Sequence, residues 1–164
     1  MKSQRNMLRR LGEFGTTNSL PFLYECATNP VVGYEAVLAS VKISGITEDN
    51  IDAIDGFLSL GDVSISDRVS AIEHISKEPA VLSASIACRT NLAAHAIGFA
   101  HGAYVWTKAM DESVIRLDPT YRYSRRRLGV MRSLQNLPLN DYATNHVESV
   151  INELVAYPES ALGD

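Results

Sequence analysis

The chain has 164 residues, of which 46% are hydrophobic and 21% charged, and its formal net charge is −4 at pH 7. This length and composition predict one domain, residues 1–164, with a sizeable core, and they exclude a disordered or fibrous chain. A pI of about 5.5 argues against a dedicated nucleic-acid-binding protein.

Residues 20–45 contain two amphipathic helical patterns that form a hairpin. Pro21 falls in the first turn of the first helix, where its missing N–H costs no hydrogen bond. Asn29-Pro30 separates the two helices, and Gly45 ends the second. The apolar positions recur at i, i+3, i+4 and i+7, and they are Leu20, Leu23, Tyr24 and Ala27, then Tyr34, Val37, Leu38 and Val41.

Two further helices are expected in residues 47–79. Thr47 is a helix start, because two acids follow it where the macrodipole favours negative charge. Ser66 and Asp67 are expected to cap the next helix, and Pro79 marks the boundary after it. The apolar positions are Ile51, Ile54 and Leu58 in one helix and Val69, Ile72 and Ile75 in the other.

Residues 80–110 make up a low-charge block in which Arg89 is the only formal charge up to residue 107. Such a block raises the alternative of a membrane span. It is, however, rich in Ala, Ser and Gly, and Asn91, His95 and His101 lie inside it. We therefore predict no membrane span but a central helix covered by its neighbours, the most buried helical segment of the chain.

Residues 120–157 are expected to form a C-terminal helical hairpin after a break near residues 117–121. Nowhere do apolar and polar residues alternate between hairpin turns, as they would in a β-strand. The predicted fold class is therefore all-α, with about seven or eight helices. The apolar positions of this hairpin are Leu128, Met131 and Leu134, then Ala143, Val147, Val150 and Leu154.

Neither the N-terminus nor the cysteines indicate export. The basic residues 1–12 are not followed by an apolar segment with a cleavage pattern, so we expect a cytoplasmic protein. Cys26 and Cys88 lie in apolar helical patterns without the spacing of a metal or redox motif. We expect both to be buried, reduced thiols.

Internal comparison of the chain suggests repeated helical hairpins. A shorter offset places Val37 on Val69 and Ile43 on Ile75, and a longer offset places residues 68–79 on residues 127–138. Amphipathic helices also match one another by default, because they share the period of the α-helix. Two architectures therefore remain open: hairpins stacked as a short solenoid, or an irregular α-helical bundle.

Residues 8–46 combine several features in a fixed order. They are LG-x-x-G at residues 11–15, Leu20-Pro21 and Leu23 in a short helix, a Pro30-Val31 turn, and Ala36 and Ala39 in a second helix. This combination resembles a repeat of the HEAT/armadillo type. The resemblance implies that residues 47–79 are a second, degenerate repeat. It also implies a binding function, since HEAT-like proteins are mostly interaction scaffolds, and it carries over no catalytic residue.

Charge is distributed unevenly along the chain. Residues 48–78 hold eight acids against two bases, whereas residues 116–132 hold six arginines against Asp118. Arginine offers a planar fork for carboxylates or phosphates, and two tyrosines nearby add faces for stacking. The candidate binding residues of this segment are Tyr121, Arg122, Tyr123, Arg125, Arg126, Arg127 and Arg132.

Two interpretations of the arginine-rich segment make different structural predictions. A patch for an acidic partner or a nucleic-acid backbone requires Arg122, Arg125, Arg126 and Arg127 to project onto open surface. Structural arginines would instead neutralise the same chain, with at least two of them paired to acids of residues 48–78.

The aromatic and histidine side chains near residue 100 allow a pocket. We expect no metal site there, because His95 and His101 are on poorly aligned helix faces and no ligand stands beside them at metal spacing. A small-molecule pocket could be lined by His95, His101, Tyr104 and Trp106; the alternative is that the histidines are satisfied core residues. The sequence holds no nucleophile elbow, P-loop or dinucleotide motif, so no catalytic residue or cofactor is predicted.

These observations favour a helical-repeat module or scaffold that presents a concave surface to a protein or peptide, an acidic one in particular, without catalytic activity of its own. One alternative is a nucleic-acid- or phosphate-binding protein that uses residues 122–132, whose affinity would fall steeply with salt. Another is a small-molecule-binding α-bundle or enzyme around residues 80–107.

Overall fold

The computed structural model describes residues 2–164, which contain ten α-helices, three short 3₁₀ helices and no β-strand. The predicted all-α class is confirmed, with more helices than expected. No helix in the described part is long and apolar enough to cross a membrane. The elements are α1 (Lys2–Phe14), η1 (Thr17–Ser19), α2 (Leu20–Ala27), α3 (Gly33–Ser44), α4 (Glu48–Leu58), α5 (Ile65–Lys77), α6 (Pro79–Leu82), α7 (Ile86–Ala103), α8 (Lys108–Leu117), η2 (Pro119–Tyr121), α9 (Arg125–Gln135), α10 (Asp141–Val155) and η3 (Glu159–Ala161).

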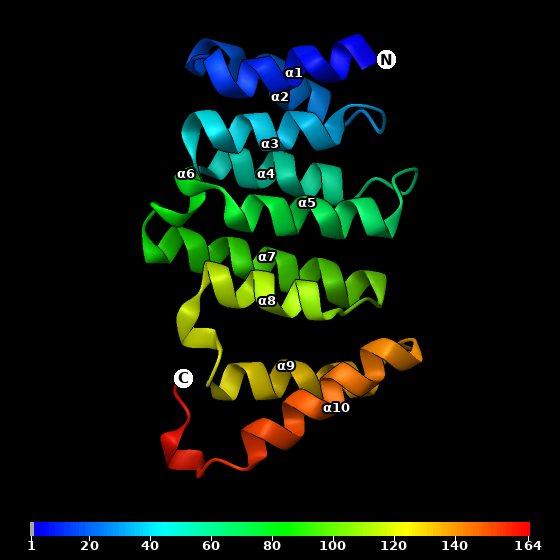
Figure 1. Cartoon of the computed structure of the whole chain (residues 1–164), viewed down its shortest axis with the longest axis vertical. Coiled ribbons are helices and arrows are strands. Elements are labelled where there is room, and N and C mark those ends of the chain that lie inside the picture. Colours follow the sequence, from blue (N-terminus) through cyan, green and yellow to red (C-terminus); the bar gives the residue numbers. More distant parts are fainter. Residues whose placement is uncertain (1) are drawn as a thin grey trace.

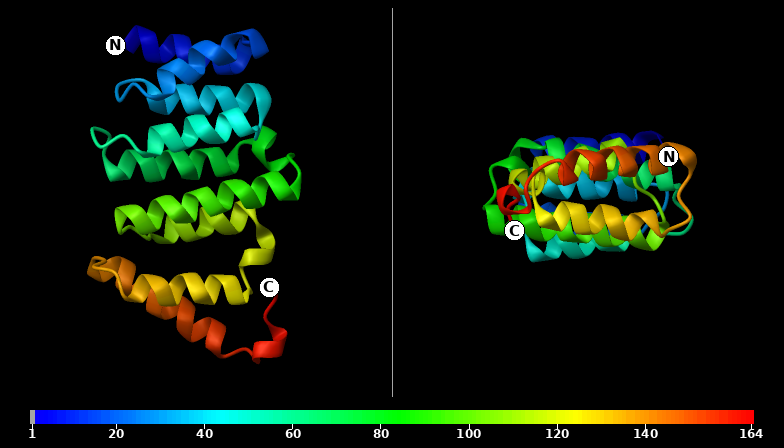
Figure 2. Two further views of the ribbon diagram at one scale, coloured as in Figure 1. Left: turned by 180° about the vertical axis from the view of Figure 1, so that it is seen from behind. Right: turned by 90° about the horizontal axis from the view of Figure 1, so that it is seen from below.

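The helices stack in chain order along the long axis of the molecule, so that α1 and α10 lie at opposite ends (Figure 1). Seen end-on, they form two layers (Figure 2). In one layer α1 packs beside α3, α3 beside α5 and α5 beside α8; in the other α2 packs beside α4 and α4 beside α7. The last two helices pack against each other, with α10 on the side of α1 and α9 on the side of α4.

Side-chain caps explain where most of these helices begin. Thr47 accepts a hydrogen bond from the backbone N–H of Asn50 and starts α4 as predicted. The cap of α5 is Ser64, two residues earlier than expected. Gly45 ends α3 with φ of 71°, a conformation that glycine adopts without a steric penalty. The remaining capping side chains are Ser85 for α7, Thr107 for α8, Ser124 for α9 and Asn140 for α10.

The core runs between the two layers for most of the length of the stack. A smaller apolar cluster joins α1 to the following hairpin through Leu8, Leu23 and Ala36. The two backbones approach closely there, since a Cβ on Gly12 would lie 3.0 Å from Cα of Ala39. Helix α1 is therefore a packed member of the stack.

The low-charge block is not the most buried segment, contrary to prediction. Helix α7 buries one face and exposes the other, whereas α8 is buried at most of its positions. Small side chains explain the difference, because Ala and Gly expose little apolar area to water. Cys26 and Cys88 are free thiols, and both are half-buried where burial was expected.

The two internal offsets correspond to different spatial relations. The shorter offset pairs α3 with α5, which are neighbours in one layer. The longer offset pairs α5 with α9, which lie in different layers (Figure 2). Only the shorter offset therefore relates two helices that lie in the same layer.

Candidate functional site

Arg127 lies inside the protein, where it binds a buried carboxylate. Its side chain donates from Nε and Nη2 to the two oxygens of Asp111, at 3.2 and 2.5 Å, and from Nη1 to the carbonyl of Arg122 at 2.9 Å. Nε2 of His146 lies 3.1 Å from Oδ2 of the same Asp111. Asp111 thus joins α8 to α9 and to α10. Because Arg127 is only 4% exposed, the expectation that it projects onto open surface is wrong.

Electrostatics explains how this carboxylate remains charged. Burial raises the pKa of Asp111, but hydrogen bonds from His146 and Arg127 and the positive charge of Arg127 outweigh burial and hold the pKa below its ordinary value. Tyr121 is also buried beside this cluster, and burial together with the charge of Asp111 raises the pKa of its phenol. This tyrosine packs in the core and offers no ring face to a binding partner.

Arg125 and Arg126 lie at the surface and are held by their own chain. The guanidinium of Arg126 lies 5.8 Å from the centre of the Tyr121 ring, and its Nη1 lies 3.9 Å from Asp118. Nη1 of Arg125 lies 3.6 Å from Asp164. Within residues 2–164 no arginine of the segment pairs with an acid of residues 48–78, so that part of the structural interpretation is wrong as well.

The remaining candidates of the arginine-rich segment are exposed. Arg122 and Arg132 are open to solvent, and the ring of Tyr123 packs 5.4 Å from that of Tyr157. Of the five candidate arginines, two are therefore open, two at the surface already have carboxylate neighbours, and one is buried. Sequence spacing could not separate these cases, because the carboxylate that binds Arg127 comes from another helix.

The four residues expected to line a pocket lie in different environments. Trp106 is fully buried, His101 is half-buried, and Tyr104 is 57% exposed where it ends α7. His95 borders two hollows, and neither is lined by any of the other three. The four side chains therefore have different surroundings, and neither hollow beside His95 contains a second one of them.

His95 instead takes part in an open groove between α4 and α7. Its Nδ1 lies 2.6 Å from Oδ2 of Asp55, which links the two helices across the groove. The volume is about 520 Å³. Arg68 lies beside the groove, with its guanidinium 5.5 Å from the Phe99 ring centre. The lining residues are Asp55, Leu58 and Ser59 of α4 and Asn91, Ala94, His95, Gly98 and Phe99 of α7.

Sequence reasoning missed this groove, although its residues carry a signal. The exposed positions Asn91, Ala94 and Gly98 recur at i, i+3 and i+7, so they share one helix face. Small side chains along such a face allow another chain to approach closely. What the sequence could not supply was the position of Asp55, which belongs to an earlier helix than His95 and reaches it only in the folded chain.

Residues 2–164 hold no cluster of three or more His, Cys, Asp or Glu side chains placed to bind a metal ion. Comparison with protein-family models, with curated protein sequences and with solved structures finds no match to this chain.

Proposed function

We propose that the chain is a short HEAT-like helical-repeat module that binds a protein or peptide and has no catalytic activity of its own. The layered arrangement supports this proposal. The pairs α2–α3, α4–α5 and α7–α8 each give one helix to each layer, and each pair packs on the next. Repeat proteins are built in this way, and the surfaces formed by successive equivalent helices are their usual binding sites.

The single observation that carries the proposal is the open groove between α4 and α7. Its floor and walls combine apolar side chains, small residues and the polar Asp55–His95 pair. A peptide could place its backbone against Ala94 and Gly98, where no large side chain stands in the way. The polar pair would orient it, because a carboxylate and an imidazole offer hydrogen bonds at the edge of an otherwise apolar contact.

Charge on the flanking helices indicates which partner fits. Helix α4 exposes Glu48, Asp49 and Asp52 in its N-terminal half, before the residues that line the groove, and α9 exposes Arg132 further along the same layer. A partner that crosses the layer would therefore place basic residues over α4 and acidic residues over α9. Such complementarity favours one orientation of the partner and raises the rate of association.

The nucleic-acid alternative has less support. Arg127 is buried, and Arg125 and Arg126 have carboxylates of the chain within 4 Å. A phosphate backbone would meet few open cations here, whereas salt-dependent affinity requires several.

Filling the groove tests the proposal. A Cβ at Gly98 or at Gly102 of α7 would meet nothing within 4 Å apart from the neighbouring backbone of its own helix, so both positions have room for a side chain. Circular dichroism checks that Trp at either position leaves the fold intact. Gly98 lines the groove and Gly102, one turn further along, does not. We expect Gly98→Trp to weaken binding by roughly tenfold or more, as blocking a central contact does, and Gly102→Trp to leave it unchanged.

The measurement has two stages. Proteins captured by the wild type and by Gly102→Trp but not by Gly98→Trp are identified, and their affinities are then measured by calorimetry with purified components. A partner that binds both Trp variants equally well would remove the groove from the proposal. Binding of a mixed-sequence DNA oligonucleotide that falls steeply with salt and is lost in Arg122→Gln/Arg132→Gln would favour the nucleic-acid alternative.

A further inference from the structure

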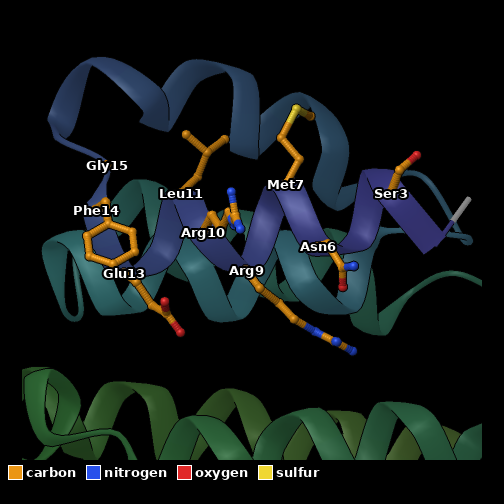
Figure 3. A pocket seen from close by; sticks show the side chains of 9 residues that line it. All are labelled: Ser3, Asn6, Met7, Arg9, Arg10, Leu11, Glu13, Phe14 and Gly15. Carbon is orange, nitrogen blue, oxygen red and sulfur yellow. The ribbon is translucent and has the colours of Figure 1, made fainter.

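The outer side of α1 is an open apolar surface at one end of the stack. Among Lys2–Phe14 only Leu8 is buried, while Met7 is 46% and Phe14 is 82% exposed. Figure 3 shows Met7 and Leu11 on one side of α1, with Arg10 and Phe14 on its open face. A groove of about 760 Å³ runs along these residues. A single exposed apolar side chain is ordinary, but several that gather along one groove are the kind of surface that marks a contact with another molecule.

This end of the stack is also basic. Residues 2–14 contain Lys2, Arg5, Arg9 and Arg10 against the single acid Glu13. Arg5 and Arg9 each lie 3.7 Å from Oε1 of Glu35, which therefore compensates part of this charge. Arg10 has no such carboxylate neighbour among residues 2–164 and lines the groove.

The opposite end of the stack has the complementary charge. Residues 141–164 contain five acids and neither lysine nor arginine. Helix α10 turns Ala143, Val147, Val150 and Leu154 inward. Its outer positions are polar and acidic but include large apolar groups, since Tyr142 is 70% and Val155 is 50% exposed. The exposed acids at this end are Asp141, Glu148, Glu153, Glu159 and Asp164, and Arg125 compensates Asp164 in part, at 3.6 Å.

The two ends also match in geometry. Helices α1 and α10 belong to the same layer, as the end-on view shows (Figure 2). A second copy placed end to end would set its α1 against α10 of the first copy, at an angle, because α10 is inclined to the other helices of the stack (Figure 1). Because α1 and α10 run in the same direction (Figure 1), the contact would bring Phe14 near Val155 and Tyr142 near the first turns of α1. The basic edge of α1 would then lie against the acidic face of α10.

We propose that two copies of this chain associate head to tail, with α1 of one copy docked on α10 of the next. The contact is heterologous, so each pair keeps one free end of each kind and further copies can add. Since α10 offers more polar than apolar surface, the association is weak, reversible and sensitive to salt. It uses the ends of the stack, so it is independent of the groove between α4 and α7.

Two variants of the full chain block one end each. Arg10→Glu/Phe14→Ser removes the basic, apolar face of α1, and Tyr142→Ser/Glu148→Lys removes the acidic face of α10. All four positions are exposed, so the fold should persist, and circular dichroism checks this. A control variant, Lys108→Glu, alters an exposed charge of α8 away from both ends.

Sedimentation velocity at increasing protein concentration and low salt gives the result. The mass of the wild type and of Lys108→Glu should rise with concentration past that of a dimer, and high salt should reverse the rise. Each end-blocked variant should stay monomeric alone, and an equimolar mixture of the two should form a heterodimer and stop there, because only one compatible pair of ends remains. A wild type that stays monomeric throughout would overturn the proposal. Self-association of the α10 variant alone would also overturn it, since this would indicate a contact between two α1 faces.

Discussion

Helices α7 and α8 lie against each other in the stack but differ in which side chains they bury. Helix α7 has 18 residues with Arg89 as its only Lys, Arg, Asp or Glu, and it leaves a full face open to water. Helix α8 has 10 residues, four of them charged, and it buries most of its length, Asp111 included. Charge content alone therefore ranks the two helices in the wrong order of burial.

Whether a charged side chain is buried depends on the hydrogen-bond and charge partners that the fold brings to it. Asp111 is buried because Arg127 and His146 supply hydrogen bonds and charge. Arg116 of α8 likewise donates to Oγ of Ser76 at 2.6 Å. On α7 the exposed residues are mostly Ala, Gly and polar groups, whose exposure costs little free energy. Such a face can serve as a binding surface without destabilising the protein.

Removing the buried carboxylate of α8 should give the largest effect. Asp111→Ala leaves the guanidinium of Arg127 buried without its partner, which typically costs about 3–5 kcal/mol of unfolding free energy. Chemical denaturation followed by circular dichroism measures the loss. The double variant Asp111→Leu/Arg127→Met should recover most of it, because no buried charge is then left unpaired. A loss below about 1 kcal/mol in Asp111→Ala would mean that water reaches the cluster.

Acid should weaken the same contact. The folded-state pKa of Asp111 lies below its ordinary value of 3.8, so its ionised form stabilises the fold at higher pH. That contribution is complete above about pH 5 and is lost as the pH falls through the ordinary value towards the folded-state pKa. Unfolding free energies measured between about pH 6 and pH 3 should fall more steeply for the wild type than for Asp111→Leu/Arg127→Met. Equal slopes would contradict the prediction.

A substitution on the open face of α7 should raise the unfolding free energy, whereas the changes at Asp111 lower it. Gly98→Ala adds a methyl group that meets nothing within 4 Å apart from the neighbouring backbone of its own helix, and it removes the flexibility that glycine gives the unfolded chain. We expect a gain of about 0.5–1 kcal/mol in unfolding free energy. Gly102→Ala, equally open, is the matched control and should behave alike. A loss at Gly98 alone would indicate that another part of the molecule covers the groove.

Much of the fold could be predicted from local patterns. Thr47 and Gly45 are a cap and a stop whose chemistry acts within a few residues, and the structure has both. The predicted cap of α5 is wrong, because Ser64 and Ser66 are both suitable residues and the sequence does not show which one has the extended backbone of a cap.

The candidate site was less predictable, because its contacts join distant segments. Arg127 looks like its neighbours Arg125 and Arg126 in the sequence, and only the carboxylate of Asp111, on the preceding α-helix, explains why it is buried. The pairing of Asp55 with His95 is equally non-local. Trp106 shows the converse case: an aromatic residue expected in a pocket is packed in the core.

The smallest effect is expected for the acid next to Asp111 in the sequence. Glu112 lies on the outer side of α8, where its Oε1 is 3.8 Å from Nζ of Lys108, and both side chains are at least half exposed. Exposed pairs at i, i+4 are worth about 0.3–0.5 kcal/mol, because water screens the attraction and two flexible side chains must be ordered. Glu112→Gln should therefore lower the unfolding free energy by at most about 0.5 kcal/mol, and high salt should abolish the difference from the wild type. The unfolding free energies of Glu112→Gln and Asp111→Asn are measured by chemical denaturation at low and at high salt. Both variants replace a carboxylate with an amide, so the two adjacent acids are compared directly. A loss above about 1 kcal/mol for Glu112→Gln that survives high salt would show that the outer side of α8 is covered too. The contrast between a buried, paired Asp111 and an exposed Glu112 would then be wrong.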